Sequence, residues 1–238
     1  MSKVFVIPDV HLKPWIFDKA EEKMESIDFN YIVLLGDIVD DWNQERNINL
    51  YIETLERVLS FISKHPDTLY CYGNHDLSYP WEALESGYSA YAHDYVVDGI
   101  KEIVASLPKE NVAYIHRIDN VLFSHAGLTE SFVRKHFGRM GQVDIDYIVD
   151  YVNKMGKAYM WQDDSPIWAR PQYGEMRLYP MDMLQVVGHT PVVEPTREDN
   201  LLTVDTFSTY RDGSPIGDET FVVADTETME YEIIYQWQ

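Results

Sequence analysis

A short apolar run that ends in a polar loop recurs three times in the first third of the chain, and this pattern constrains the fold most. The runs cover residues 3–7, 31–35 and 68–72, and they have the length and composition of buried strands. Helix-like stretches at about 16–27 and 49–64 separate them. Parallel strands joined by helices place their loops at one edge of a sheet. We therefore expect the three polar loops to meet at that edge.

The later part of the chain is richer in strand-like runs. These runs cover 112–118, 121–124, 183–187, 201–205, 220–224 and 229–235, with helical patterns at about 129–137 and 144–160. The pair Asp119-Asn120 predicts a hairpin turn between the first two runs. Strand–helix alternation followed by antiparallel strands favours an α/β fold with a central β-sandwich and helices on both outer faces, which makes four layers, α/β/β/α.

The sequence contains no repeat, low-complexity tract or Pro/Gly/Ser-rich linker that would mark a domain boundary. A chain of 238 residues can bury a sizeable core, so we predict a single domain over residues 1–238. Residues 77–107 are rich in tyrosine, tryptophan and acidic side chains and have weak periodicity. We interpret this aromatic-rich segment as an insertion of mostly irregular or helical structure.

Composition limits where the protein works. No apolar run approaches the roughly 18 residues of a membrane span, and the N-terminus lacks the apolar core of a signal peptide. The single cysteine, Cys71, excludes an internal disulfide, so we expect a soluble protein of the reducing cytoplasm. The formal net charge of −21 repels phosphate backbones and anionic lipids. Long nucleic acids and membranes are therefore not expected as partners.

Six side chains with metal-binding chemistry stand at the ends of five predicted strands. They are Asp9, His11, Asp37, Asn74, His125 and His189. Mixed nitrogen and oxygen ligation suits manganese, iron or zinc better than calcium. Two such ions close together can hold a phosphoryl group and convert a bridging water into a nucleophilic hydroxide. The alternative is that the Asp and Asn residues cap helices while the histidines pack in the core.

Five short blocks of sequence resemble, in residue type and order, the signature blocks of the calcineurin-like metallophosphoesterases. They are Pro8-Asp9-Val10-His11, Gly36-Asp37-Ile38-Val39-Asp40, Gly73-Asn74-His75-Asp76, Ser124-His125-Ala126-Gly127 and Gly188-His189-Thr190. The extension to Asp40, and Pro191 where many phosphodiesterase and nuclease relatives have a second histidine, are similar to the phosphoprotein phosphatases, especially their small bacterial and phage members. The blocks span residues 8–190.

This resemblance implies the metallo-dependent phosphatase fold and a role for each residue of the site. One ion would be held by Asp9, His11 and Asp37, and the other by Asp37, Asn74, His125 and His189. His75 would protonate the leaving alkoxide, and Asp40 would orient its imidazole. Arg170, in a Trp-x-Arg block, would bind the substrate phosphate. The implied cofactors are two divalent metal ions, with Mn2+ as first choice and iron or zinc as alternatives.

One departure from the family pattern concerns substrate binding. The phosphoprotein phosphatases usually have Arg-Gly after the second block, and the arginine contacts the phosphate, whereas this chain has Asp41-Trp42. Loss of this contact should weaken phosphomonoester binding unless another cation, such as Arg46, replaces it. The departure therefore bears on the substrate class more than on the reaction.

Together these features predict a dimetal phosphatase that hydrolyses phosphomonoesters, with protein serine/threonine phosphate as the first substrate class and small phosphoesters accepted in vitro. The oligomeric state is left open. A dinucleoside polyphosphate hydrolase or phosphodiesterase of the same fold is the alternative, because the phosphate-binding arginine is missing at Asp41 and the chain carries the aromatic insertion. A metal-binding interaction module without turnover is a third hypothesis, although it would leave His75 without a purpose.

Overall fold

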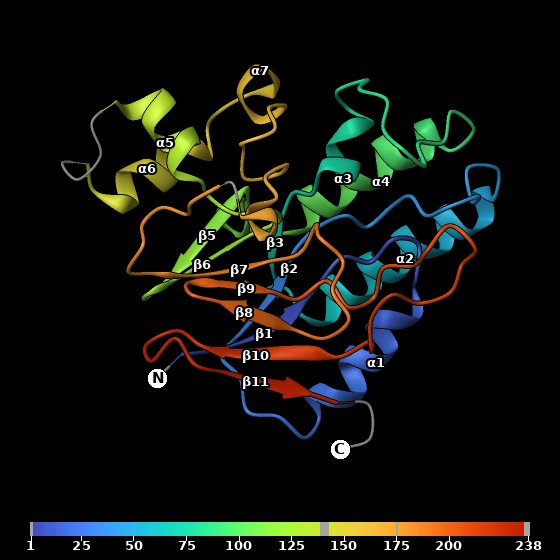
Figure 1. The fold of residues 1–238 in the computed structure, drawn as a ribbon. Coiled ribbons are helices and arrows are strands. Elements are labelled where there is room, and N and C mark those ends of the chain that lie inside the picture. Colours follow the sequence, from blue (N-terminus) through green and yellow to red (C-terminus); the bar gives the residue numbers. More distant parts are fainter. Residues whose placement is uncertain (1, 139–142, 175, 236–238) are drawn as a thin grey trace.

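Two β-sheets pack face to face in the computed structural model, which describes residues 2–138, 143–174 and 176–235 (Figure 1). The first sheet contains β1 (Lys3–Ile7), β2 (Tyr31–Leu34), β3 (Leu69–Cys71), β4 (Val112–Ala113), β10 (Phe221–Asp225) and β11 (Tyr231–Ile234), in the order β11-β10-β1-β2-β3-β4. The second contains β5 (Ile115–Ile118), β6 (Val121–Ser124), β7 (Leu184–Val187), β8 (Thr196–Glu198) and β9 (Leu201–Thr203), in the order β5-β6-β7-β9-β8.

Helices cover the outer face of each sheet, which completes four layers and confirms the expected fold class. The helices are α1 (Trp15–Met24), α2 (Ile48–Lys64), α3 (Asn74–Ser78), α4 (His93–Ser106), α5 (Glu130–Phe137), α6 (Ile145–Val152) and α7 (Lys157–Met160), with short 3-10 turns at Lys109–Asn111 and Pro171–Tyr173. Figure 1 shows α1, α2 and α4 grouped on one side of the molecule and α5, α6 and α7 on the other. Among the described residues, no helix is both long and apolar enough to cross a membrane.

The alternation of side chains along β1 builds two of the layers at once. Val4 and Val6 point between the sheets and pack in the same cluster as Phe123 and Val186 of the second sheet. Residues of β1 on the opposite face join the cluster beneath α1, α2 and α4. Because successive strand residues point to opposite faces, a strand that is apolar throughout must be covered on both faces. The sandwich follows from that requirement.

The strands β1, β2, β3 and β4 run parallel, so their carboxyl ends meet at one edge as expected. In the second sheet, β6, β7 and β9 also run parallel, which corrects the expectation of antiparallel strands in the later part. Antiparallel pairs are formed by β1 with β10, β10 with β11, β5 with β6 and β8 with β9. The helices α5, α6 and α7 lie between β6 and β7 in the chain and provide the crossover that parallel pairing needs.

The predicted strand 112–118 is two strands that belong to different sheets. β4 pairs with β3, and β5 pairs with β6 across the expected turn at Asp119-Asn120. The chain crosses between the sheets at Tyr114, where the Asn153 side chain accepts from the backbone N–H groups of Tyr114 and Ile115. The predicted helix 144–160 is likewise divided, into α6 and α7, with Gly156 at the start of the second.

The segment 77–107 begins at the end of α3, continues through turns and ends in α4. α4 packs on α2, and the approach is close at Gly99, where an added Cβ would lie 2.7 Å from Cδ1 of Leu55. The segment is thus part of the outer helical layer rather than a separate lobe.

Candidate metal centre

The six expected ligands follow the carboxyl ends of strands of both sheets, five of them in loops and Asn74 at the first residue of α3. Asp9, Asp37 and Asn74 follow β1, β2 and β3, while His125 and His189 follow β6 and β7. Several of these loops turn sharply: His11, Asp37, Asp40 and His189 have φ values of 44°, 46°, 68° and 63°. Non-glycine residues rarely adopt this left-handed conformation, and it is concentrated at functional sites. The surrounding packing therefore holds the site in a strained backbone geometry.

Two glycines allow the ligand loops to approach one another. An added Cβ at Gly188 would lie 1.8 Å from Oδ1 of Asp9, and one at Gly73 would lie 2.1 Å from Oδ1 of Asp37. These contacts are far shorter than any van der Waals distance. In the space that Gly188 leaves, the backbone N–H of His189 donates to both carboxylate oxygens of Asp9, at 3.2 and 2.9 Å. The glycines of the sequence blocks thus fix where the carboxylates lie.

Four side chains from both sheets converge on one point. Nε2 of His125 lies 3.0 Å from Oδ1 of Asn74, 3.0 Å from Nδ1 of His189 and 3.2 Å from Oδ2 of Asp37. Asp9, His11 and Asp37 form a second cluster, in which Nε2 of His11 lies 3.9 Å from Oδ2 of Asp9 and 3.8 Å from Oδ2 of Asp37. Within each cluster, the ligand atoms of the aspartates and histidines lie within 4.8 Å of one another. The two sets are Asp37, His125 and His189, and Asp9, His11 and Asp37. Asp37 belongs to both clusters.

Hydrogen bonds on the far side of two imidazoles decide which nitrogen faces the clusters. Nδ1 of His11 lies 2.7 Å from the carbonyl oxygen of Asp40, and Nδ1 of His125 lies 2.9 Å from that of Leu35. A carbonyl accepts only, so each Nδ1 carries a proton, and in the neutral imidazole each Nε2 presents its lone pair to the cluster. This is the arrangement that metal-binding histidines usually have.

The crowding of buried charges strongly perturbs the protonation of the site. Burial and the nearby Asp205 raise the pKa of Asp9 well above its ordinary value. Burial also acts to raise the pKa of Asp37, but the surrounding histidines, His125 first, outweigh it and hold that pKa below its usual range. Burial lowers the pKa of His125, but Asp37 and Asp9 more than compensate and raise it to about 9. Carboxylates so close together require compensating positive charge.

The donor set fits divalent metal ions. Carboxylate, imidazole and amide groups are the ligands that borderline first-row ions accept. Ligand atoms about 2.1 Å from one ion lie roughly 3.0–3.4 Å apart in octahedral or tetrahedral geometry, and the atoms around His125 Nε2 have this spacing. In addition, Nε2 of His189 is buried without a hydrogen-bond partner among the described residues. Core packing rarely leaves a buried polar atom unpaired, so this nitrogen favours a binding role for the cluster.

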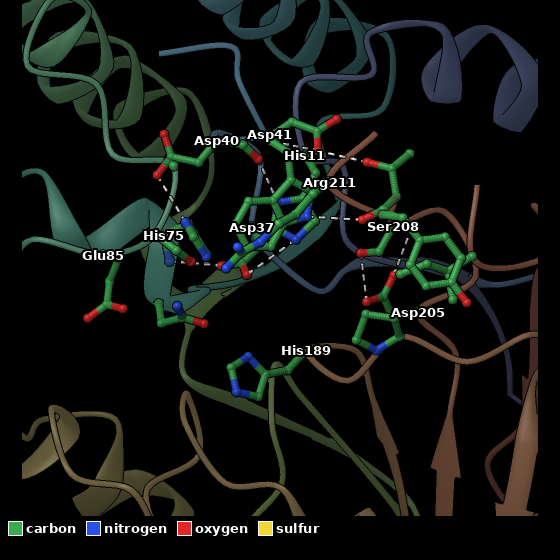
Figure 2. Close-up of a pocket in the computed structure, with 18 of the residues that line it drawn as sticks. His11, Asp37, Asp40, Asp41, His75, Glu85, His189, Asp205, Ser208 and Arg211 are labelled. Atoms are coloured by element: carbon green, nitrogen blue, oxygen red, sulfur yellow. Dashed lines mark hydrogen bonds and ion pairs between the residues drawn. The ribbon is translucent and has the colours of Figure 1, made fainter. Parts of the chain in front are cut away.

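His75 and Asp40 form a hydrogen-bonded pair beside the clusters (Figure 2). Nδ1 of His75 lies 2.9 Å from Oδ2 of Asp40, while Oδ1 of Asp40 accepts from the hydroxyls of Tyr51 and Tyr79, at 2.9 and 2.5 Å. Burial lowers the pKa of His75, but Asp37 and Asp40 outweigh burial and raise it to about 9. The pair therefore favours a protonated imidazole that can donate a proton.

Asp205 is a residue of the site that the sequence analysis missed. It is buried, lines the same pocket as His11 and Asp37, and accepts from the backbone N–H and the hydroxyl of Ser208, at 3.2 and 2.9 Å. Its carboxylate adds negative charge beside Asp9 and His11. Asp205 ends the predicted strand 201–205, so the rule that selected the other ligands, a polar residue at a strand end, would have selected it too.

A pocket of about 350 Å³ opens over the clusters, and Arg170 is part of its lining. Nη1 of Arg170 donates to the carbonyl of His189 at 2.8 Å and to Oγ1 of Thr190 at 3.1 Å, which fixes the guanidinium at the edge of the site. Asp41, at the position where the phosphoprotein phosphatases usually have an arginine, forms an ion pair with Lys13 at 3.0 Å. Arg46 stacks on Tyr91, 5.2 Å from the ring centroid, and does not line the pocket. Arg46 is therefore not the replacement cation.

Comparisons with known proteins bear on the family and on the fold. The family model of calcineurin-like phosphoesterases matches residues 2–212. The fold is similar to that of a Saccharomyces cerevisiae protein serine/threonine phosphatase described as similar to human phosphatase PP5, with a TM-score of 0.53 and 14% identity over 98% of this chain and 80% of that one. A metallophosphoesterase from Sphaerobacter thermophilus gives a TM-score of 0.45 and 14% identity over 98% of this chain and 88% of that one. A comparison with curated protein sequences found no match.

Proposed function

Because the chain belongs to the calcineurin-like phosphoesterase family, we propose that it is a dimetal phosphatase that hydrolyses phosphomonoesters, with protein serine and threonine phosphates as its first substrate class. The observation that supports this proposal most is the His75–Asp40 pair, which lies in the same pocket as two donor clusters that share Asp37. A site that only bound metal would have no need of a positioned proton donor.

In this proposal, Asp9, His11 and Asp37 hold one divalent ion and Asp37, Asn74, His125 and His189 hold the other, with manganese as first choice. Two bound ions would supply Lewis acidity, which stabilises charge on the phosphoryl oxygens and lowers the pKa of a bound water. Arg170 orients the phosphate, since its guanidinium is fixed at the pocket edge by His189 and Thr190.

His75 supplies the proton that the leaving alkoxide needs. Nδ1–H of its imidazolium donates to Asp40, so the ring is fixed with Nε2–H as the remaining donor. Asp40 is itself held by two tyrosine hydroxyls, so it cannot turn away from His75. An alkoxide is a strong base and a poor leaving group, and a positioned general acid typically accelerates its departure by about 10²- to 10⁴-fold.

One observation favours a second candidate, a phosphodiesterase or dinucleoside polyphosphate hydrolase. Asp41 places a carboxylate at the pocket where the phosphatases have a phosphate-binding arginine. A phosphomonoester dianion suffers more from this exchange than a phosphodiester monoanion, because the electrostatic cost scales with the charge of the ligand.

The two candidates are separated by substrate profiling with and without manganese. We expect turnover of para-nitrophenyl phosphate and of a phosphoserine peptide that manganese stimulates and a chelator abolishes. Faster turnover of bis-para-nitrophenyl phosphate or of a dinucleoside polyphosphate would favour the second candidate. Absence of manganese-dependent turnover on all four substrates, in protein that binds manganese, would refute both and support a metal-binding module.

A further inference from the structure

Asp41, at the position of the phosphoprotein phosphatases' phosphate-binding arginine, and the two residues after it hold a different arginine at the pocket. Asp41, Trp42 and Asn43 all bond to the loop that connects β9 to β10, more than 160 residues away in sequence. We propose that Arg211, at the tip of this loop, is a substrate phosphate-binding residue and takes the place of the missing clamp. This inference rests on the proposed function, because it names a substrate contact of the same site.

Three hydrogen bonds fasten the loop. Oγ1 of Thr209 donates to Oδ1 of Asp41 at 2.8 Å, Nε1 of Trp42 donates to the carbonyl of Thr209 at 3.0 Å, and Nδ2 of Asn43 donates to the carbonyl of Arg211 at 2.8 Å. Each of three consecutive residues thus contributes one bond. The ion pair of Asp41 with Lys13 fixes the Asp41 carboxylate to which the loop is bonded. Residues 41–43 therefore anchor the β9–β10 loop beside the pocket.

The tip of the loop is itself a tight turn. The backbone N–H of Tyr210 donates to the carbonyl of Ser214, and that of Gly213 donates back to the carbonyl of Tyr210, at 2.8 and 2.9 Å. Gly213 has a φ of 83°, which side chains disfavour. Two hydrogen bonds from Ser214 to Asp212 close the turn further. The position of Arg211 is therefore defined by its backbone.

The Arg211 side chain lies over the Trp42 ring, with its guanidinium carbon 4.8 Å from the ring centroid, and lines the pocket with His11, Asp37 and Asp41 (Figure 2). Among the described residues, no carboxylate forms an ion pair with it. Stacking on an aromatic face leaves the in-plane N–H groups of a guanidinium directed outward, where they can bond phosphate oxygens.

The charge of the pocket explains why a second cation is needed. The described lining contains five carboxylates, Asp37, Asp40, Asp41, Glu85 and Asp205, whereas its arginines are Arg170 and Arg211. The chain as a whole carries a formal charge of −21, which repels a phosphate dianion. Because Arg211 and Arg170 both line the pocket, a phosphate over the metal centre would have a guanidinium from each of two separate segments of the chain.

The test compares Arg211→Ala and Arg211→Lys with the matched control Arg46→Ala, which removes an arginine that also stacks on an aromatic ring but lies outside the pocket. The measurements are KM and kcat for para-nitrophenyl phosphate, the competitive inhibition constant of inorganic phosphate, and manganese content. We expect Arg211→Ala to raise both KM and the inhibition constant by about 10- to 100-fold. Arg211→Lys should lose less, because it keeps the charge, and manganese content should stay the same in all variants.

An inhibition constant for phosphate that is unchanged in Arg211→Ala, or raised equally in Arg46→Ala, would overturn the role of Arg211. Either result would leave the proposed function standing, since wild-type turnover is measured in the same experiment. If the wild type turns over no phosphoester, the proposed function fails on its own. Calorimetric binding of inorganic phosphate to the manganese-loaded wild type and Arg211→Ala then still tests Arg211, because equal affinities would refute it.

Discussion

Replacement of Asp40 by asparagine tests whether the carboxylate sets the proton affinity of His75. The side chain keeps its size, but the charge that faces Nδ1 of His75 at 2.9 Å is lost. A hydrogen bond to a charged group contributes roughly 1.5–3 kcal/mol, and about 1.4 kcal/mol corresponds to one pKa unit. The pKa of His75, which Asp37 and Asp40 raise to about 9 against the opposing effect of burial, should therefore fall by about one to two units in Asp40→Asn.

The sign of the effect on activity follows from the role of the proton. In the proposed mechanism, protonated His75 is the active form for a strongly basic leaving group, so we expect the rate to fall as the pH rises through the pKa of His75. A lower pKa moves this fall to lower pH. Bound cations lower the pKa in wild type and variant alike, so the difference between the two is the quantity to measure. The assay is kcat/KM against pH for a phosphoserine peptide and for para-nitrophenyl phosphate.

The two substrates differ in their need for a proton. Para-nitrophenolate is a weak base and leaves unaided, so we expect the alkaline fall, and its shift in Asp40→Asn, with the phosphoserine peptide alone. The control Glu85→Gln removes another carboxylate of the pocket, one that forms no hydrogen bond or ion pair with His75 within the described part of the chain. It should shift the profile much less. Identical profiles for Asp40→Asn and wild type on the peptide, or equal shifts on both substrates, would refute proton donation by His75.

Further predictions concern metal binding, the backbone at Gly188 and the thiol of Cys71. Manganese at about 100 times its Kd should add roughly 2.7 kcal/mol to the free energy of unfolding and raise Tm by about 5–11 °C. Asp37→Asn, which removes the proposed shared ligand, should lose most of this gain and all turnover. An equal rise of Tm in the variant would contradict the bridging assignment. Gly188→Ala should displace Asp9 and lower both Tm, by about 2–10 °C, and manganese content, whereas Gly156→Ala, with nothing within 4 Å of the added Cβ, should change neither. Cys71 is buried, and burial raises the pKa of its thiol; a disulfide-exchange reagent should label it only after denaturation, and labelling of native protein that accelerates between pH 7 and 9 would show the thiol to be accessible.

The part of the fold that the sequence predicted best is the first sheet and its ligand loops. The runs 3–7, 31–35 and 68–72 correspond to β1, β2 and β3 with ends that differ by at most one residue. Each run is apolar and bounded by polar residues, and helices between the runs enforce a parallel arrangement. Local pattern and topology agree there, so short-range information was sufficient.

The second sheet was harder to predict for a physical reason. A short strand that is buried on both faces is apolar throughout, and its sequence does not indicate in which direction it pairs, so the parallel pairing of β6, β7 and β9 could not be predicted. β8 gave no apolar signal at all, because all three of its residues are exposed. Arg211 also lacked a signal: it is exposed in a turn, and its place at the pocket depends on contacts with Trp42 and Asn43.

The proposed ligands come from both sheets: Asp9, Asp37 and Asn74 follow strands of the first, and His125 and His189 follow strands of the second. Neither sheet alone could assemble the cluster around Nε2 of His125, so the site exists only once the two halves have closed on the apolar layer between them. Enzymatic competence should therefore emerge in refolding at the last docking step, after most secondary structure has formed. Core substitutions between the sheets, far from any ligand, should accordingly behave as metal-affinity mutants.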